Sequence, residues 1–327
     1  MSRRRFLRQT SALGAASLLG LTQTARAEPP PEIGRVRLTN APGICLAPLY
    51  LAEELLRLEG FSNVEYVEYR SGNVYSGTVD FSQETAPQIL PALDAGQPVV
   101  ALAGIHVGCF ELVANERIRA IRDLKGKRIA ITGSGAAEHL LLSSMLAYVG
   151  IDPGKDINWV MGDDSPRTLA LFTEDKADAI MGFAPQPQDL RERKIGHVLV
   201  NTALDRPWSQ YFCCMLVAHR EFTEKYPIAT KRALRAFLKA TDICAQQPER
   251  VARLLVAKGY EPRYEIALEV LKELPYNRWR EANPEDTLRF HALRLHEVGM
   301  IKSTPQKLIA QGTDWRFLNE LNKEMKA

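Results

Sequence analysis

The fold is decided where a short strand turns into a helix, at residues 128–148, which read RIAITGSGAAEHLLLSSMLAY. Residues 128–132 have the apolar pattern of a buried strand, and residues 136–148 have the pattern of a helix, which Gly150 stops. The same order of elements already occurs upstream, in residues 35–103. A β/α pattern that restarts in this way predicts an α/β protein with two doubly wound sheets.

Strand and helix patterns extend on both sides of this stretch. Upstream, strands are predicted at 35–39, 64–69, 78–81 and 99–103, and helices at 48–59 and 86–95. Downstream, strands are predicted at 157–160, 177–181 and 197–200, with a helix at 165–173. From Cys213 onward the pattern is almost entirely helical, with helices that begin at Pro227 and Pro248 and further helices near 262–273, 284–298 and 304–310.

The chain is long enough for two lobes, and no linker-like composition separates them. We therefore expect crossing strands between the lobes rather than a single linker. The predicted first lobe combines residues 28–106 and 213–327, and the predicted second lobe is residues 107–212.

Residues 1–27 are typical of a secretory signal peptide, with an arginine-rich start, a short apolar run and Ala25-Arg26-Ala27 as cleavage site. The arginine pair before Phe6-Leu7 resembles a twin-arginine signal, and an ordinary Sec signal is the alternative. Cleavage after Ala27 predicts a soluble protein in the periplasm.

The charge balance argues against nucleic acid as a partner. The formal net charge of +3 includes five arginines in residues 1–27 and no acid there, so the remaining chain carries −2. We expect a monomer that binds a small molecule.

The motifs of cofactor, nucleotide and metal sites are missing from the sequence. There is no phosphate-binding loop, no G-x-S-x-G elbow and no Cys/His spacing of a zinc site, and His106-x-x-Cys109 is only a fragment of one. The sequence therefore predicts no catalytic residue, no metal and no cofactor.

Two glycine-containing turns are the best candidates for a binding site. One is Gly133–Ala136, where Ser134 is predicted to cap the following helix, and the other is Gly43–Leu46. Each follows a strand, and ligands of open α/β sheets bind at the carboxyl ends of the strands. A plain strand-to-helix turn is the alternative for each. The predicted ligand contacts, from these turns and from other strand ends, are Ile44, Cys45, Leu46, Asp80, Phe81, His106, Gly133, Ser134, Gly135, Ala136, Phe183 and Gln186.

The chain resembles the sulfonate/nitrate/taurine group of ABC-importer binding proteins, which includes thiamine-pyrimidine (NMT1/THI5-like) members. The resemblance is carried by the order and spacing of segments 47–54, 79–81, 123–130 and 178–185. It implies a two-lobed, type II-like periplasmic binding fold that closes on a small organic or anionic nitrogen or sulfur compound, without chemistry, and an ABC permease as partner. Of the contacts above, it carries over Ile44, Cys45, Asp80, Phe81, His106, Ser134, Gly135 and Gln186.

Two other functions are compatible with the same fold. A related enzyme that makes the thiamine pyrimidine has a cysteine cluster, and Cys213-Cys214 is similar to part of it. A periplasmic sensor partner is the other alternative. In the crossing-strand architecture Cys109 should lie near Cys213 or Cys214, either as a disulfide or as free, packed thiols, and only one of the neighbouring pair should face it.

Overall fold

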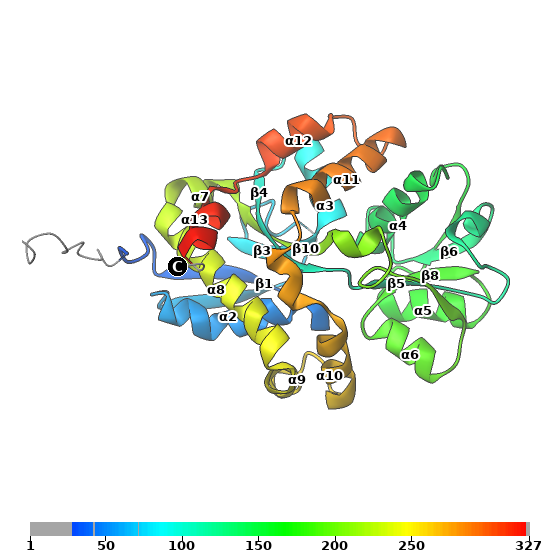
Figure 1. Cartoon of the computed structure of the whole chain (residues 1–327), viewed down its shortest axis with the longest axis horizontal. Helices are drawn as coiled ribbons and strands as arrows, with labels where there is room; N and C mark the ends of the chain where they lie inside the picture. The colour runs from blue at the N-terminus through cyan, green and yellow to red at the C-terminus, as the bar shows by residue number, and fades with distance from the viewer. Residues whose placement is uncertain (1–27, 42, 71, 325–327) are drawn as a thin grey trace, which may run out of the picture. The chain divides into compact units, whose positions relative to one another are not determined.

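The strands of the chain form two five-stranded sheets in a computed structural model that describes residues 28–41, 43–70 and 72–324 (Figure 1). Residues from 31 onward form one compact unit, to which the following description refers. The signal peptide predicted at 1–27 lies outside the described residues. The strands are β1 Arg35–Asn40, β2 Asn63–Glu68, β3 Phe81–Thr85, β4 Val99–Val107, β5 Phe110–Ala114, β6 Arg128–Ile131, β7 Asn158–Met161, β8 Ala179–Phe183, β9 His197–Asn201 and β10 Phe212–His219.

Helices surround both sheets, and α4, α5 and α6 gather around the second one (Figure 1). None of those in the described part of the chain has the length and apolar character needed to span a bilayer. The α-helices are α2 Ala47–Leu58, α3 Ala86–Asp94, α4 Ala137–Tyr148, α5 Ser165–Thr173, α6 Gln186–Glu192, α7 Arg220–Lys225, α8 Pro227–Gln246, α9 Pro248–Ala257, α10 Tyr264–Glu273, α11 Pro284–Glu297, α12 Pro305–Gly312 and α13 Arg316–Glu324. The 3₁₀ helices are η1 Ile44–Leu46, η2 Ile121–Leu124, η3 Trp208–Gln210 and η4 Tyr276–Arg280.

Each sheet contains one antiparallel strand that arrives from the other part of the chain. The first sheet has the order β2-β1-β3-β10-β4, in which β10 runs against both β3 and β4. The second has the order β7-β6-β8-β5-β9, in which β5 runs against both β8 and β9. All other strands of a sheet run parallel to one another, so the carboxyl ends of four strands meet at one edge of each sheet. This confirms the predicted α/β class with two sheets joined by crossing strands.

The chain passes between the sheets twice, from β4 to β5 and from β9 to β10. Gly108, in the first passage, packs so closely on the second that a Cβ on it would lie 2.3 Å from the backbone of Ala203. The lobe limits at 106/107 and 212/213 remain a prediction. Helix α11 lies against both α3 and α4, so the C-terminal helices contact elements beside both sheets.

Two predictions about strands are wrong. The strand predicted at 78–81 begins at Phe81 and continues to Thr85. The segment after Cys213 is not helical at first, because β10 extends to His219 as a fully paired central strand. Both faces of β10 are buried, so it reads as a continuous apolar run without the alternation that marks a half-exposed strand.

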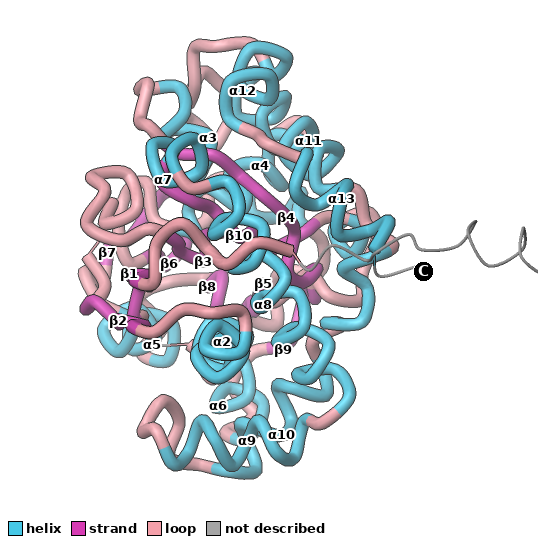
Figure 2. Tube along the Cα trace, turned by 90° about the vertical axis from the view of Figure 1, so that its left-hand side faces the viewer, coloured by secondary structure: helices cyan, strands magenta, loops and turns pink. Residues whose placement is uncertain are grey.

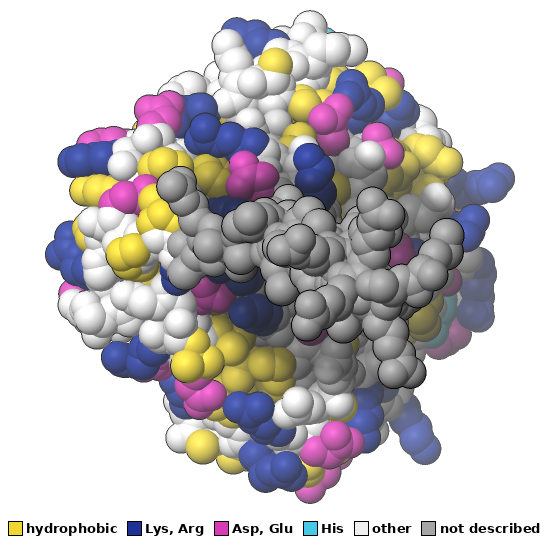
Figure 3. Space-filling view, turned by 60° about the vertical axis from the view of Figure 1, so that its left-hand side comes forward, with side chains coloured by type: hydrophobic (Ala, Val, Ile, Leu, Met, Phe, Trp, Pro, Cys, Tyr) yellow, Lys and Arg dark blue, Asp and Glu magenta, His cyan; other side chains and the backbone are white. Residues whose placement is uncertain are grey.

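The core of the first sheet is built with the C-terminal helices. Phe81 packs edge-on against Phe222, with ring centroids 5.1 Å apart, and lies near Phe237 of α8. The surface is mixed in charge, and Figure 3 shows Lys/Arg and Asp/Glu side chains interspersed over the face it displays. This agrees with the small net charge of the sequence.

Candidate functional site

A cavity of about 570 Å³ lies where the carboxyl edges of the two sheets face each other. The first sheet contributes residues that follow β1 and end β3, and the second contributes the segments after β6 and β7 and the end of β8. This volume is in the range of small-molecule sites. Its position agrees with the rule that ligands of open α/β sheets bind at the carboxyl ends of strands.

Half of the predicted contact residues line this cavity: Cys45, Leu46, Ser134, Gly135, Ala136 and Phe183. Four others lie close behind it. Ile44 is buried in the core, Gly133 belongs to the same turn as Ser134, and His106 is fully buried. Gln186 donates a hydrogen bond from Nε2 to the carbonyl of Ser165, 3.1 Å away, and so holds a residue of the cavity wall.

Asp80 and Phe81 do not line this cavity, and their predicted contact with ligand stays a prediction. The strand begins where we expected it to end, which places both residues at the opposite edge of the sheet. Asp80 there accepts hydrogen bonds from the backbone N–H of Arg37 (2.7 Å) and from its guanidinium (2.6 Å), and Phe81 is buried among aromatic rings.

The turn after β6 is held by acceptors from α4 rather than by the predicted Ser134 cap. The N-cap residue of α4 is Ala136, and its side chain makes no capping bond. Glu138 Oε1 instead accepts from the N–H and the hydroxyl of Thr132, at 2.7 and 2.5 Å. The N–H of Gly135 donates to Nδ1 of His139, 3.0 Å away, so this donor is already engaged by the protein.

Sequence reasoning missed most polar residues of the cavity. Among its described lining residues, three are acidic and none is Lys or Arg. Burial raises the pKa of one of them, Glu84, to about 7, although a hydrogen bond from Ser82 opposes that shift. The residues not predicted include Tyr69, Gln83, Glu84, Thr85, Gln88, Cys109, Thr132, Glu138, Asp163, Ser165 and Cys214.

Four residues that can ligate a metal ion meet at the floor of the cavity, although the sequence predicted no metal site. We call Cys45, His106, Cys109 and Cys214 the Cys-His cluster; their ligand atoms all lie within 4.8 Å of one another. Burial by itself lowers the pKa of His106, but the neighbouring Cys214 and Cys45 raise it to about 10.

The predicted approach of the distant cysteines is confirmed. Cys109 Sγ lies 2.7 Å from Cys213 Sγ, and all five cysteines are free thiols. The expectation that only one of the vicinal pair could face Cys109 is wrong, because both Cys213 and Cys214 approach it. The pairing of β10 with β4 shifts register between Phe212 and Cys214, and this irregularity breaks the alternation of sides.

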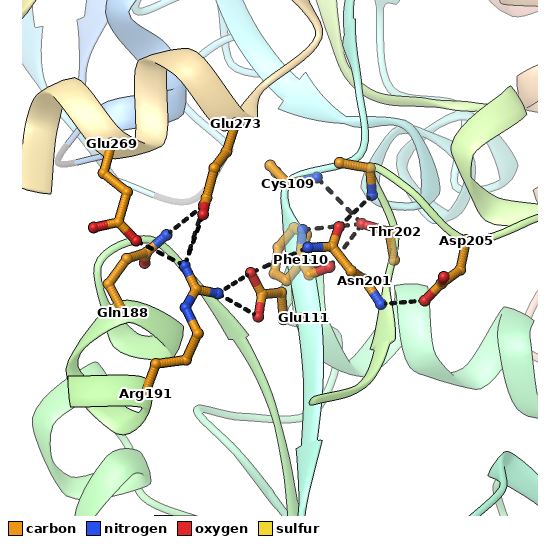
Figure 4. Close-up of polar contacts among 11 residues, drawn as sticks. Cys109, Phe110, Glu111, Gln188, Arg191, Asn201, Thr202, Asp205, Glu269 and Glu273 are labelled. Atoms are coloured by element: carbon orange, nitrogen blue, oxygen red, sulfur yellow. Dashed lines mark hydrogen bonds and ion pairs between the residues drawn. The ribbon is translucent and has the colours of Figure 1, made fainter. Parts of the chain in front are cut away.

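A second polar network joins α6 to α10 (Figure 4). The guanidinium of Arg191 contacts Glu111 of β5 at 2.6 Å, and Glu269 and Glu273 of α10 at 3.0 Å each. Figure 2 shows α6 near α10, in agreement with these contacts. Strand β5 and helix α6 belong with the second sheet, whereas α10 packs against η1 and α9. The network therefore connects elements associated with the two different sheets.

Solved structures share this two-sheet arrangement. The alkanesulfonate-binding protein SsuA from Xanthomonas axonopodis pv. citri, bound to MOPS, is 18% identical with a TM-score of 0.69, over 88% of this chain and 99% of that one. The periplasmic nitrate-binding protein NrtA from Synechocystis PCC 6803 is 15% identical with a TM-score of 0.72, over 90% of each chain. The desulfurization enzyme DszB is 16% identical with a TM-score of 0.61, over 89% of this chain and 99% of that one.

The fold is therefore that of the periplasmic binding proteins, which an enzyme also shares. Residues 62–251 match the family described as NMT1/THI5 like, which is more than half of the chain. The chain belongs to this family. A search of curated proteins found no match.

Proposed function

We propose that the chain is the solute-binding component of an ABC importer and captures a small nitrogen-containing organic molecule between its two sheets. The observation that carries the proposal is the cavity of about 570 Å³ whose walls come from the carboxyl edges of both sheets. Binding there gains contacts from two sides at once. Similar structures include binding proteins for an alkanesulfonate and for nitrate, which supports a transport role.

The charge of the cavity favours a neutral or cationic ligand over a sulfonate or nitrate. Glu84, Glu138 and Asp163 line it, and no Lys or Arg stands among its described lining residues. An anion would face carboxylates without a counter-charge, which is unfavourable in a partly desolvated site. An amine-bearing heterocycle, such as an aminopyrimidine, would instead donate hydrogen bonds to these acceptors.

We further propose that the protein works in the periplasm as a monomer with an inner-membrane permease as partner. The arginine-rich segment 1–27 would direct export, by the twin-arginine or the Sec route. The division into a first lobe of 28–106 with 213–327 and a second lobe of 107–212 would provide the two halves that close on the ligand.

A thermal-shift screen tests the ligand class. Aminopyrimidines, alkylamines, alkanesulfonates and nitrate are compared at equal concentration. A ligand at one hundred times its dissociation constant stabilises the folded state by about 2.7 kcal/mol, which raises the melting temperature measurably. Stabilisation by sulfonates or nitrate alone would refute the charge argument.

Two matched aspartates sharpen this test. Asp163 lines the cavity and Asp175 does not, and both have a left-handed backbone, with φ of 66° and 56°, which Asn also tolerates. Asp163→Asn should weaken a cationic ligand about fivefold, or about 1 kcal/mol, as expected for a solvent-accessible charge pair. Asp175→Asn should leave binding unchanged; equal effects of the two variants would contradict the proposed site.

An enzyme of the same fold is the second candidate, favoured by the Cys-His cluster and by the likeness to DszB. Binding and catalysis differ in what happens to the bound molecule. The ligand found by the screen is incubated with the protein and recovered for mass spectrometry. Unchanged ligand agrees with transport, and a new product would identify an enzyme. A sensor role would instead show as binding without any associated permease.

A further inference from the structure

The Cys-His cluster has the composition and arrangement of a metal site. Its members come from four places: η1, the end of β4, the passage to β5 and the start of β10. Three thiol sulfurs and one imidazole nitrogen within 4.8 Å of one another match the donor set of a tetrahedral Cys₃His centre. Because these segments are distant in the sequence, only His106-x-x-Cys109 appears there as a local motif.

The orientation of His106 is a second, independent observation. Its Nδ1 lies 3.3 Å from the carbonyl oxygen of Gly108, and a carbonyl only accepts, so Nδ1 carries the hydrogen. Its Nε2 is fully buried and has no hydrogen-bond partner among the described residues. Histidine ligands of metals are commonly held in this way, with one nitrogen on a backbone carbonyl and the other directed at the ion.

Surrounding residues hold two members of the cluster, Cys45 and His106, through contacts that do not involve sulfur. The carbonyl of Cys45 accepts hydrogen bonds from Gln83 Nε2 (3.1 Å) and from the hydroxyl of Tyr276 (3.2 Å). The ring of Tyr276 also packs edge-on against His106, with centroids 5.2 Å apart. These buried contacts position Cys45 and His106, as hydrogen bonds to the ligand residues do in known metal sites.

We propose that the Cys-His cluster binds one divalent metal ion of the kind that prefers tetrahedral thiolate coordination, for which Zn²⁺ is the probe. Thiolate-rich tetrahedral sets favour Zn²⁺ over hard cations such as Mg²⁺ or Ca²⁺. The ion joins the binding turn after β1 to β4, to the passage between β4 and β5, and to β10. It also lies at the floor of the cavity, since three of its four ligands line that cavity.

Cys213 and Cys244 are the internal controls for this proposal. Cys213 contacts Cys109 but is not one of the four, and Cys244 is a buried cysteine of α8 in the core of the first sheet. If the metal ion bound to any available thiol, loss of Cys213 or Cys244 would affect binding as much as loss of Cys45. A metal held by the Cys-His cluster requires Cys45 and His106 and neither of the controls.

The test is metal binding by the whole chain, purified under reducing conditions and freed of metal by chelation. Zn²⁺ should bind in a ratio of one per chain, and Co²⁺ should give the thiolate charge-transfer and d–d absorption of a tetrahedral centre. Cys45→Ser and His106→Gln should lose this spectrum, whereas Cys213→Ser and Cys244→Ser should keep it. Circular dichroism confirms that each variant is folded.

A second measurement needs no variant. Zn²⁺ should protect Cys45, Cys109 and Cys214 from alkylation, but not Cys213, as read from peptide masses. The proposal is overturned if the reduced chain binds neither ion, if Cys45→Ser retains the cobalt spectrum, or if Zn²⁺ protects no thiol. The assay uses no transport ligand, so its failure would leave the proposed function intact, and a failed ligand screen would not affect the metal site.

Discussion

Replacing Arg191 by Met tests whether the network between α6 and α10 stabilises the protein through a buried charge. Glu111 has only 8% of its side chain exposed and is contacted by Arg191 at 2.6 Å. Among the described residues, the variant leaves this carboxylate with the Asn201 amide, at 3.3 Å, as its only side-chain donor. Removal of one partner of a fully buried ion pair costs about 3–5 kcal/mol. Because Arg191 is 34% exposed, water can reach the vacated site, and we expect a loss of about 2 kcal/mol.

The loss should depend on pH with a defined sign. Burial raises the pKa of Glu111 even with Arg191 present, and removal of the guanidinium raises it further. A carboxyl whose folded pKa lies above its unfolded value is protonated in the folded state at low pH and loses stability as pH rises. The deficit of Arg191→Met, measured by urea unfolding, should therefore be larger at pH 8 than at pH 5.

Two further variants isolate the cause. The double variant Arg191→Met/Glu111→Gln has no buried charge and should recover most of the stability lost at pH 8. Lys272→Met removes an exposed ion pair of α10, with Glu249 at 2.9 Å, and should cost less than about 1 kcal/mol. The reasoning is refuted if Arg191→Met is as stable as the unsubstituted protein at pH 8, or if the double variant is no more stable than the single one.

Two other variants test the cavity wall and the strand crossing. Burial raises the pKa of Glu84 from 4.5 to about 7, so its ionisation costs the folded state up to about 3 kcal/mol above pH 7 and nothing below pH 4.5. Glu84→Gln should match the original protein in urea unfolding at pH 4.5 and exceed it at pH 8; a gain of equal size at both pH values would contradict this assignment. Gly108→Ala should cost about 3 kcal/mol or more, because φ is 49° and its Cβ would lie 2.3 Å from backbone atoms of Ala203. Gly126→Ala, with φ of 74° and no atom within 4 Å of the added Cβ, should lose only about 1–2 kcal/mol, and similar losses at both glycines would argue against the tight crossing.

Local signals in the sequence located most elements of the fold. Helices α2, α8 and α9 each have a proline in their first turn, where the missing N–H costs nothing, and this made their starts recognisable. Strands β5 and β10 could not be located in this way. Both are paired on two sides with strands from another part of the chain, and their fully buried residues show no alternation.

The site was predicted only where it follows from strand order. The turns after β1 and β6 reach the cavity because carboxyl ends of parallel strands share an edge. The predicted limits of β3 were wrong by a few residues. Asp80 was therefore expected at the carboxyl edge of the sheet, although it lies at the opposite edge, just before the strand. The Cys-His cluster depends on the approach of four segments, and no spacing in the sequence encodes that approach.

The central position of β10 constrains the order in which the chain can fold during synthesis. Strands β3 and β4 both lie before residue 108, yet they are not neighbours, because β10 pairs with both of them. A nascent chain that has not yet reached His219 therefore holds two strands with unpaired edges, and such edges promote aggregation. The first sheet can be completed only after all strands of the second sheet have left the ribosome. A fragment that ends before residue 212 should accordingly require a chaperone to remain in solution.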